Sequence, residues 1–123
     1  MRTAMVVDDS RAVRMIIART LRKLGYDVAE AGDGRQALDA LEKGAATDVV
    51  LADWNMPEMD GLSLLKAIRA NPAFSGIPVI MVTTEAEFDQ MATAIAEGAA
   101  EYVMKPFTAD ILVDKLRIVG LAE

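Results

Sequence analysis

The chain has 123 residues, enough for one domain that buries about two thirds of its unfolded surface. It contains no cysteine and no histidine, which excludes a disulfide framework, cysteine-based metal sites and histidine-based acid–base chemistry. A net charge of −6 without a dense basic stretch argues against direct binding of nucleic acid, and the apolar runs are too short to span a membrane. We expect a single domain, residues 1–123, in a soluble cytoplasmic protein.

Strand-like and helix-like segments alternate along the whole chain. The apolar run TAMVV predicts a first strand, and Ser10 is placed to cap a helix from Arg11 to Leu24 that ends at Gly25. The next predicted strands are YDVAE, DVVLA, IPVIMV and AEYVM. The helices that follow them are 34–43, capped by Asp33, 61–70, 86–97, and 109–119, capped by Thr108. This alternation predicts an α/β fold with a parallel sheet covered by helices on both faces.

Charged and hydroxyl side chains follow four of these strands. Asp8 and Asp9 come after the first strand, Asp53 after the third, Thr83 after the fourth and Lys105 after the fifth. Because the carboxyl ends of parallel strands meet at one edge of a sheet, these side chains are expected in one crevice. Three carboxylates, a hydroxyl and an ammonium group together suit a divalent metal ion and a phosphoryl group.

Each of these residues has a plainer interpretation when it is taken alone. Adjacent like charges such as those of Asp8 and Asp9 are unfavourable unless a cation lies between them, and their oxygens suit Mg²⁺, but acids also stabilise the start of a helix. Asp53 is a candidate nucleophile toward phosphorus, a third metal ligand or a helix-capping acid. Thr83 is a candidate donor to a phosphoryl oxygen or simply a β-branched strand end. Lys105 is a candidate phosphate contact or a solvated surface residue.

The chain resembles the receiver domain of bacterial two-component response regulators, most closely the stand-alone chemotaxis members of that family. The segments that carry the resemblance are VVDDS, DWNMPEMDGL, VTTEA and YVMKPFTAD, and the likeness extends over essentially the whole chain. It implies a flavodoxin-like (βα)5 fold, which is a doubly wound parallel sheet of five strands in the order 2-1-3-4-5.

The resemblance also implies roles for the residues at the strand ends. Asp53 corresponds to the phospho-acceptor. Mg²⁺, with Mn²⁺ as the alternative ion, would be bound by Asp9, Asp53 and the backbone carbonyl of Asn55, with Asp8 acting directly or through water. Lys105 would pair with Asp53 before the reaction and with a phosphoryl oxygen afterwards.

Further positions correspond to those that transmit or terminate the signal in this family. Thr83 and Tyr102 match the switch pair, in which the hydroxyl moves to the phosphoryl group and the ring turns inward. Asn55 and Glu85 match positions that tune hydrolysis of the acyl phosphate. Thr84 departs from the family, which usually has Ala or Gly there, and its bulk leaves the rate of dephosphorylation open.

The family implies protein partners on both sides of the switch. The phosphodonor would be a histidine kinase or a histidine-phosphotransfer protein, and the target would bind the fourth helix, fifth strand and fifth helix. Glu87 and Asp89 would weaken attraction to an acidic target such as the flagellar motor, or are only favourable helix N-terminal charge. Glu87, Phe88 and Tyr102 are the candidate residues of the partner surface. Phe88 is either a contact residue or a core or half-buried one. A motor-binding regulator, a phosphate sink and an adaptor for another output protein remain open.

We expect a signalling protein that catalyses only its own phosphorylation and slow dephosphorylation. It is expected to be a monomer, with a phosphorylation-dependent dimer as the alternative. Two other classes compete with this interpretation. A Mg²⁺-dependent phosphatase would use Asp8 as nucleophile, but such enzymes generally show Asp-x-Asp, whereas Asp9 is adjacent here. A flavodoxin-like cofactor binder would need a hydroxyl- or glycine-rich phosphate loop after the first strand.

Overall fold

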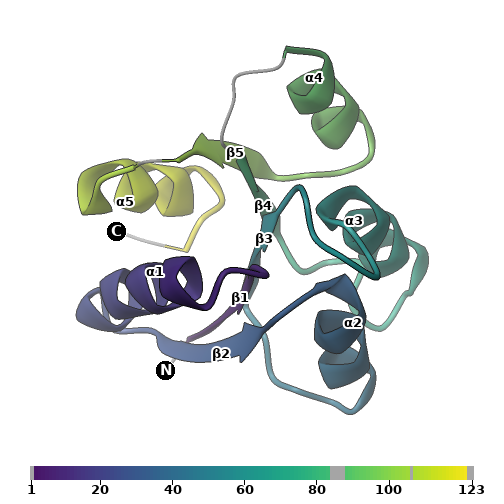
Figure 1. Cartoon of the computed structure of the whole chain (residues 1–123), viewed down its shortest axis with the longest axis horizontal. Coiled ribbons are helices and arrows are strands. Elements are labelled where there is room, and N and C mark those ends of the chain that lie inside the picture. Colours follow the sequence, from purple (N-terminus) through teal and green to yellow (C-terminus); the bar gives the residue numbers. More distant parts are fainter. Residues whose placement is uncertain (1, 84–87, 106, 122–123) are drawn as a thin grey trace.

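The computed structural model describes residues 2–83, 88–105 and 107–121. Its centre is one parallel sheet of five strands in the order β2-β1-β3-β4-β5 (Figure 1). The strands are β1 (Thr3–Val7), β2 (Asp27–Ala31), β3 (Val49–Asp53), β4 (Val79–Thr83) and β5 (Glu101–Met104). The predicted flavodoxin-like fold and strand order are confirmed.

Within the described residues, five helices cover the two faces of this sheet. They are α1 (Arg11–Lys23), α2 (Gly34–Glu42), α3 (Gly61–Ala70), α4 (Phe88–Ala96) and α5 (Ala109–Ile118). Figure 1 shows α1 and α5 on one face, with α2, α3 and α4 on the other. Among the described residues, no helix has both the length and the apolar character needed to cross a membrane.

The helix starts follow the predicted capping residues. The side chain of Ser10 accepts a hydrogen bond from the backbone N–H of Val13, and that of Asp33 accepts one from Gln36. Thr108 caps α5 in the same way. Each cap satisfies a backbone donor that the first turn of a helix leaves without a partner. The first turns are therefore fixed next to the strand ends.

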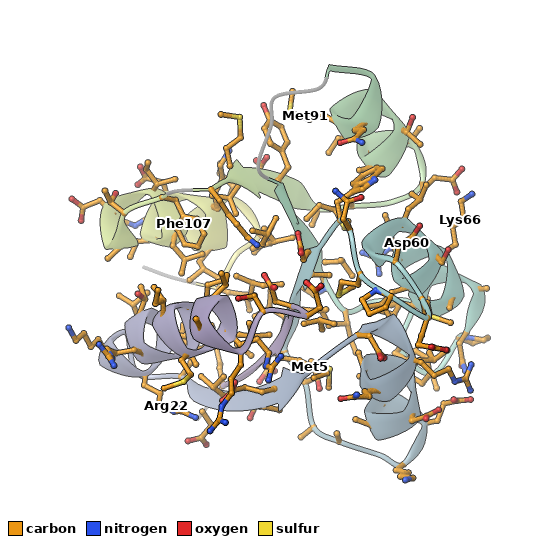
Figure 2. The ribbon with its side chains drawn as sticks, in the orientation of Figure 1. Met5, Arg22, Asp60, Lys66, Met91 and Phe107 are labelled. Atoms are coloured by element: carbon orange, nitrogen blue, oxygen red, sulfur yellow. The ribbon has the colours of Figure 1, made fainter. Side chains whose placement is uncertain are left out.

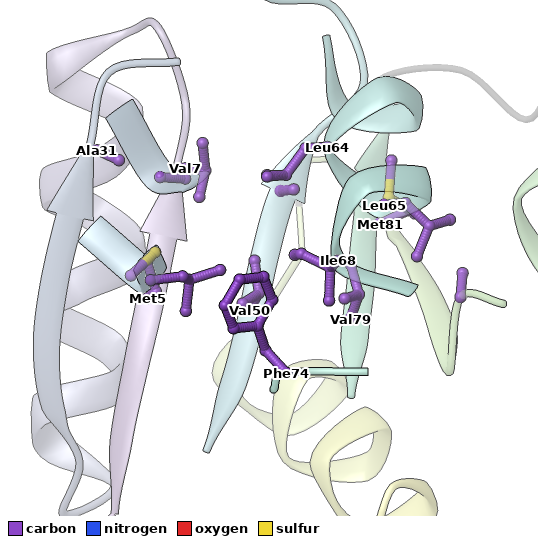
Figure 3. Close-up of a cluster of buried hydrophobic side chains, with 14 of the residues drawn as sticks. Met5, Val7, Ala31, Val50, Leu64, Leu65, Ile68, Phe74, Val79 and Met81 are labelled. Carbon is purple, nitrogen blue, oxygen red and sulfur yellow. The ribbon is translucent and has the colours of Figure 1, made fainter. Parts of the chain in front are cut away.

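The central strand β3 is buried on both faces, as its unbroken apolar run predicts. Val49 and Leu51 pack with α1 and α5 residues, whereas Val50 and Ala52 pack on the opposite face. Figure 3 shows the second of these clusters, in which Val50 lies beside Phe74. Successive strand residues thus alternate between two apolar cores, and the sheet is held from both sides.

The second and third strands lie one residue further along the chain than predicted, and the fourth and fifth begin later than predicted. The second strand runs from Asp27 to Ala31, and the third includes Asp53 as its last residue. Asp53 pairs with Val82 of β4, and the next backbone N–H, that of Trp54, still donates to the carbonyl of Val82 at 3.2 Å. Asp53 is therefore part of the sheet rather than the first residue of a loop.

Candidate functional site

Three carboxylates meet at the carboxyl edge of the sheet. Asp8 and Asp9 follow β1, and Asp53 ends the neighbouring strand β3. One oxygen from each of the three lies within 4.8 Å of the others. Asp8 is only 1% exposed, Asp53 is half-buried and Asp9 is exposed. The structure therefore brings together the acidic residues that the sequence places at separate strand ends.

The backbone N–H and both carboxylate oxygens of Asp8 form hydrogen bonds. Its backbone N–H donates to the carbonyl of Ala31 at 3.1 Å, which extends the pairing of β1 with β2. One carboxylate oxygen accepts from the backbone N–H of Ser10 at 2.9 Å, and the other accepts from Nζ of Lys105 at 2.6 Å. This network fixes the direction of a buried charge and provides it with a cation.

Lys105 reaches the cluster from the end of β5. Its ammonium nitrogen lies 2.6 Å from Oδ2 of Asp8 and 3.6 Å from Oδ1 of Asp53, and its side chain is 17% exposed. The ammonium thus bridges the two carboxylates, with the shorter contact to Asp8. A single positive charge facing three carboxylates leaves the crevice with an excess of negative charge.

The pKa of the Asp53 carboxyl is raised above its ordinary value of 3.8, mainly because burial disfavours the charged form. The Lys105 ammonium opposes this rise, whereas the Asp8 carboxylate adds to it. The backbone N–H of Trp54 lowers the pKa, and the Asp9 carboxylate raises it slightly further. An additional cation in the crevice would stabilise the ionised form of Asp53.

The donor set fits a hard divalent cation. Mg²⁺ prefers oxygen ligands, is typically bound by one or two carboxylates and keeps several waters. The three clustered carboxylates offer such oxygens with a net negative charge, and exposed Asp9 leaves one side open to solvent. Asn55 lies exposed in the loop two residues after Asp53. The crevice is suited to holding a metal ion with Asp8, Asp9 and Asp53.

Two glycines at helix starts shape this edge of the sheet, and the sequence reasoning missed both. A Cβ atom on Gly61 would lie 2.2 Å from the backbone oxygen of Asp53. The backbone N–H of Gly61 donates to the carbonyl of Trp54 at 3.0 Å. A Cβ on Gly34 would lie 2.6 Å from the backbone oxygen of Met59. The available signal was the repeated Asp-Gly pair, since a glycine directly after a capping residue permits close backbone approach. Figure 2 shows Asp60, the capping residue before Gly61, at the start of α3.

The predicted switch and partner residues lie around β5. The ring of Tyr102 is half-buried, and Nζ of Lys115 in α5 lies 4.7 Å from its centroid. Tyr102 also lines a shallow, mostly apolar pocket with Met91 and Ile95 of α4. Tyr102 therefore contacts α5 through Lys115 and borders the pocket that α4 lines.

Several predicted residues cannot be placed in the same detail. Thr83 ends β4, with Met104 as its backbone partner in β5, and Phe88 begins α4. The side chains of Thr83, Phe88 and Asp89 lie outside the described residues, as do Thr84, Glu85 and Glu87 entirely. Their predicted roles stay predictions.

The sequence profile described as the response regulator receiver domain matches residues 4–117. The chain belongs to the response regulator receiver family. It is 48% identical over 116 residues to chemotaxis protein CheY1 of Helicobacter pylori, which covers 94% of each chain. It is 47% identical over 113 residues to a CheY homolog of Campylobacter jejuni, covering 91% of this chain and 87% of the relative.

Solved structures agree with this assignment. Chemotaxis protein CheY4 of Vibrio cholerae matches with a TM-score of 0.88 at 36% identity, over 95% of this chain and 97% of that one. A response regulator of Chloroflexus aurantiacus matches with a TM-score of 0.90 at 30% identity, over 96% and 97% of the two chains. The receiver is therefore a signalling protein that works as a phosphorylation-dependent switch, and it is similar to chemotaxis regulators of the CheY type.

Proposed function

We propose that the receiver accepts a phosphoryl group on the carboxylate of Asp53 from a phosphohistidine of a histidine kinase or histidine-phosphotransfer protein. The observation that carries this proposal is the cluster of three carboxylates within 4.8 Å, with Lys105 contacting two of them. Mg²⁺, or Mn²⁺ in its place, would be held there by Asp9, Asp53 and the backbone carbonyl of Asn55, with Asp8 acting directly or through water. The bound ion supplies positive charge that offsets the charge of the phosphoryl oxygens.

Asp53, rather than Asp8, is suited to be the nucleophile. Both carboxylate oxygens of Asp8 already accept hydrogen bonds, and the residue is 1% exposed. The side chain of Asp53 is 13% exposed, and its ion pair with Lys105 is the longer contact, at 3.6 Å. An oxygen of Asp53 can therefore approach phosphorus from solvent. This contrast disfavours a phosphatase that uses Asp8.

Transfer requires positioning and charge neutralisation more than acid–base chemistry. An oxygen of Asp53 forms the new P–O bond in line with the P–N bond to the donor histidine, which breaks. Lys105 then exchanges its contact with Asp53 for one with a phosphoryl oxygen. Because burial raises the pKa of Asp53, the cations of the crevice also keep its carboxylate ionised for attack.

The phosphoryl group adds about −1.5 to −2 of charge and favours one of two conformations of the domain. We assign the response to Thr83 and Tyr102, which lie on adjacent strands. Support comes from the position of Tyr102, which contacts Lys115 of α5 and lines the pocket beside α4. The output surface is then α4, β5 and α5, including Glu87 and Phe88. The similarity to CheY proteins supports a protein target in chemotaxis.

The test is intact mass spectrometry after incubation with acetyl phosphate, with and without Mg²⁺. Wild type is expected to gain one phosphoryl group only when Mg²⁺ is present, and Asp53→Asn is expected to gain none while keeping its fold. Asp8→Asn serves as the matched variant because it also removes one carboxylate charge from the crevice. Incorporation that persists in Asp53→Asn and disappears in Asp8→Asn would reassign the acceptor to Asp8.

A further inference from the structure

Arg14 lies in the first turns of α1 and connects three elements around the acidic crevice. Its Nη1 donates to the backbone oxygen of Asp8 at 2.6 Å, and its Nε donates to Oε1 of Glu30 in β2 at 3.3 Å. The side chains of Arg14 and Glu30 are 17% and 33% exposed. Arg14 thereby links the β1–α1 loop to the neighbouring strand β2.

The bond to Asp8 acts on the peptide group that joins two of the acidic residues. The carbonyl of Asp8 and the N–H of Asp9 belong to the same planar unit, so fixing that oxygen fixes the plane between them. The N–H of Asp8 is already held by the carbonyl of Ala31 at 3.1 Å. With Arg14 in place, both backbone polar groups of Asp8 are bonded, so the peptide group that joins Asp8 to Asp9 is held in one orientation.

The two cations near the crevice therefore act differently. Lys105 contacts the carboxylates of Asp8 and Asp53 directly. Within the described residues, Arg14 forms its ion pair with Glu30, which is not one of the three clustered carboxylates. Arg14 reaches the cluster through a backbone oxygen. Its planar guanidinium can donate in two fixed directions at once, which a lysine ammonium on a flexible stem does not reproduce.

We propose that Arg14 is a positioning residue for the metal-binding loop, which holds Asp8 and Asp9 in the geometry that binds Mg²⁺. This inference rests on the proposed function, because it needs the crevice to bind Mg²⁺. Groups that orient metal ligands without touching the ion typically change metal affinity by about 10–100-fold when they are removed.

The sign of the effect separates positioning from simple charge. A positive side chain near a cation site repels the cation, so removing its charge alone would tighten Mg²⁺ binding. Loss of the bond to the Asp8 carbonyl would weaken Mg²⁺ binding, because the ligands lose their fixed direction. The two explanations therefore predict opposite changes in one measured quantity.

The experiment is a Mg²⁺ titration in which binding is measured by isothermal calorimetry and by the fluorescence of Trp54. Trp54 is the only tryptophan of the sequence and directly follows Asp53. Arg14→Met removes the charge and both donors but keeps an unbranched stem, and about tenfold weaker Mg²⁺ binding is expected. Arg14→Lys keeps the charge but loses the paired geometry, and its affinity should lie between those of wild type and Arg14→Met. Arg19→Met, at an exposed position of the same helix, makes the same charge change and should bind Mg²⁺ within about twofold of wild type.

The half-saturating Mg²⁺ concentration for acetyl phosphate incorporation should rise by the same factor in Arg14→Met, with the rate at saturating Mg²⁺ little changed. Thermal unfolding in EDTA verifies that each variant is folded, and Arg14→Lys carries the test if Arg14→Met does not fold. Unchanged or tighter Mg²⁺ binding in Arg14→Met, or wild-type affinity in Arg14→Lys, would overturn the inference. Absence of Mg²⁺ binding by wild type would overturn the proposed metal site itself, and the inference with it, before any variant is compared.

Discussion

Asp8 and Asp53 lie at the carboxyl ends of neighbouring strands of the same sheet, but they differ in burial and in hydrogen bonding. Asp8 is almost fully buried, and its carboxylate accepts hydrogen bonds from Ser10 and Lys105. Asp53 is less buried, and Lys105 lies at the longer distance of 3.6 Å from it. A carboxylate with both oxygens bonded keeps a fixed geometry, whereas one with fewer partners can form a new bond. The first is suited to holding a metal ion and the second to accepting a phosphoryl group.

The loops that carry these two residues differ in the same way. The β1–α1 loop passes directly from Asp8 through Asp9 to the helix cap, and Arg14 bonds its first carbonyl. The β3–α3 loop runs from residue 54 to residue 60 and contains Glu58 at a φ of 63°. Its two ends are closed by the bond from Gly61 N–H to the carbonyl of Trp54. The shorter loop is held at Asp8 and Ser10, whereas the longer loop is held at its two ends and by the bond from Gly34 N–H to the Met59 carbonyl at 3.0 Å.

The largest effect is expected where α3 meets the backbone of Asp53. Gly61→Ala would place a Cβ 2.2 Å from the Asp53 carbonyl oxygen and 2.8 Å from the end of the Met81 side chain. Backbone atoms cannot give way as a side chain can, so the free energy of unfolding should fall by about 3 kcal/mol or more. Because the movement displaces Asp53, acetyl phosphate incorporation should fall as well. Urea denaturation and intact mass measure the two effects.

Gly76→Ala is the matched control for that variant. Apart from its two chain neighbours, no described residue has a heavy atom within 4 Å of the position that a Cβ on Gly76 would take, and the φ of Gly76 is not in the left-handed region. Its stability should be unchanged or higher by up to about 1 kcal/mol, because alanine restricts the unfolded chain. Equal stabilities for the two variants would show that α3 does not press against Asp53 in solution.

The next largest effect concerns the cation shared by the two carboxylates. Lys105→Met removes an ammonium that lies 2.6 Å from Asp8 and 3.6 Å from Asp53, so Mg²⁺ should bind about tenfold more tightly. Arg14→Met is expected to change the affinity in the opposite direction. The phosphorylated Lys105 variant should also fail to gain affinity for its protein target. Mg²⁺ titration of Trp54 fluorescence and a binding assay with the phosphorylated protein measure the two outcomes.

Lys66→Met makes the same charge change at an exposed position of α3, where Figure 2 shows Lys66 on the outer side of the helix. Its Mg²⁺ affinity should stay within about twofold of wild type, because an exposed charge is screened. Weaker Mg²⁺ binding in Lys105→Met would instead mean that the ammonium assembles the ligands rather than competing with the ion.

A smaller effect should appear in the stability of the metal-free protein. Because burial raises the pKa of Asp53 in the folded state, the folded state binds more protons than the unfolded state above pH 3.8. The stability that Asp53 contributes is therefore fully present below the pKa of its carboxyl in the unfolded state. It is lost as the pH rises through the higher pKa that this carboxyl has in the folded state. At neutral pH the ionised Asp53 destabilises the fold, so Asp53→Asn should be more stable than wild type in EDTA. Thermal unfolding between pH 4 and pH 7 should show this advantage shrinking as the pH falls.

Saturating Mg²⁺ should reduce or reverse that advantage, because the ion binds folded wild type more tightly than the variant. An advantage for Asp53→Asn that did not depend on pH would point to packing or hydrogen bonding rather than to the charge of Asp53.

The sequence was sufficient for the features that local pattern and sheet geometry determine. The caps at Ser10, Asp33 and Thr108 follow from residue type directly before an amphipathic segment. The meeting of Asp8 with Asp53 follows from the rule that parallel strands end at one edge. Both inferences need the order of elements and not the exact path of any side chain.

What the sequence did not reveal depends on distances of a few ångströms between segments. The sequence paired Lys105 with Asp53 and did not reveal its shorter contact with Asp8, which joins residues 97 positions apart. The bond from Arg14 to the Asp8 carbonyl depends on how the first turns of α1 lie against the loop. The close approach of Gly61 to Asp53 is set by the packing of α3 on the sheet.

The smallest expected effect tests how the β3–α3 loop is built. Glu58 has a φ of 63°, in the left-handed region that costs most L-residues roughly 1–2 kcal/mol and asparagine less. Glu58→Asn should therefore raise the free energy of unfolding by about 0.5–1 kcal/mol and leave Mg²⁺ affinity within about twofold of wild type. Glu58→Ala removes the same negative charge but keeps a side chain that disfavours this conformation, so it should be less stable than Glu58→Asn. If urea denaturation gives the two variants equal stabilities, the charge of Glu58 rather than its backbone accounts for the change, and the contrast between the two loops would no longer extend to stored backbone strain.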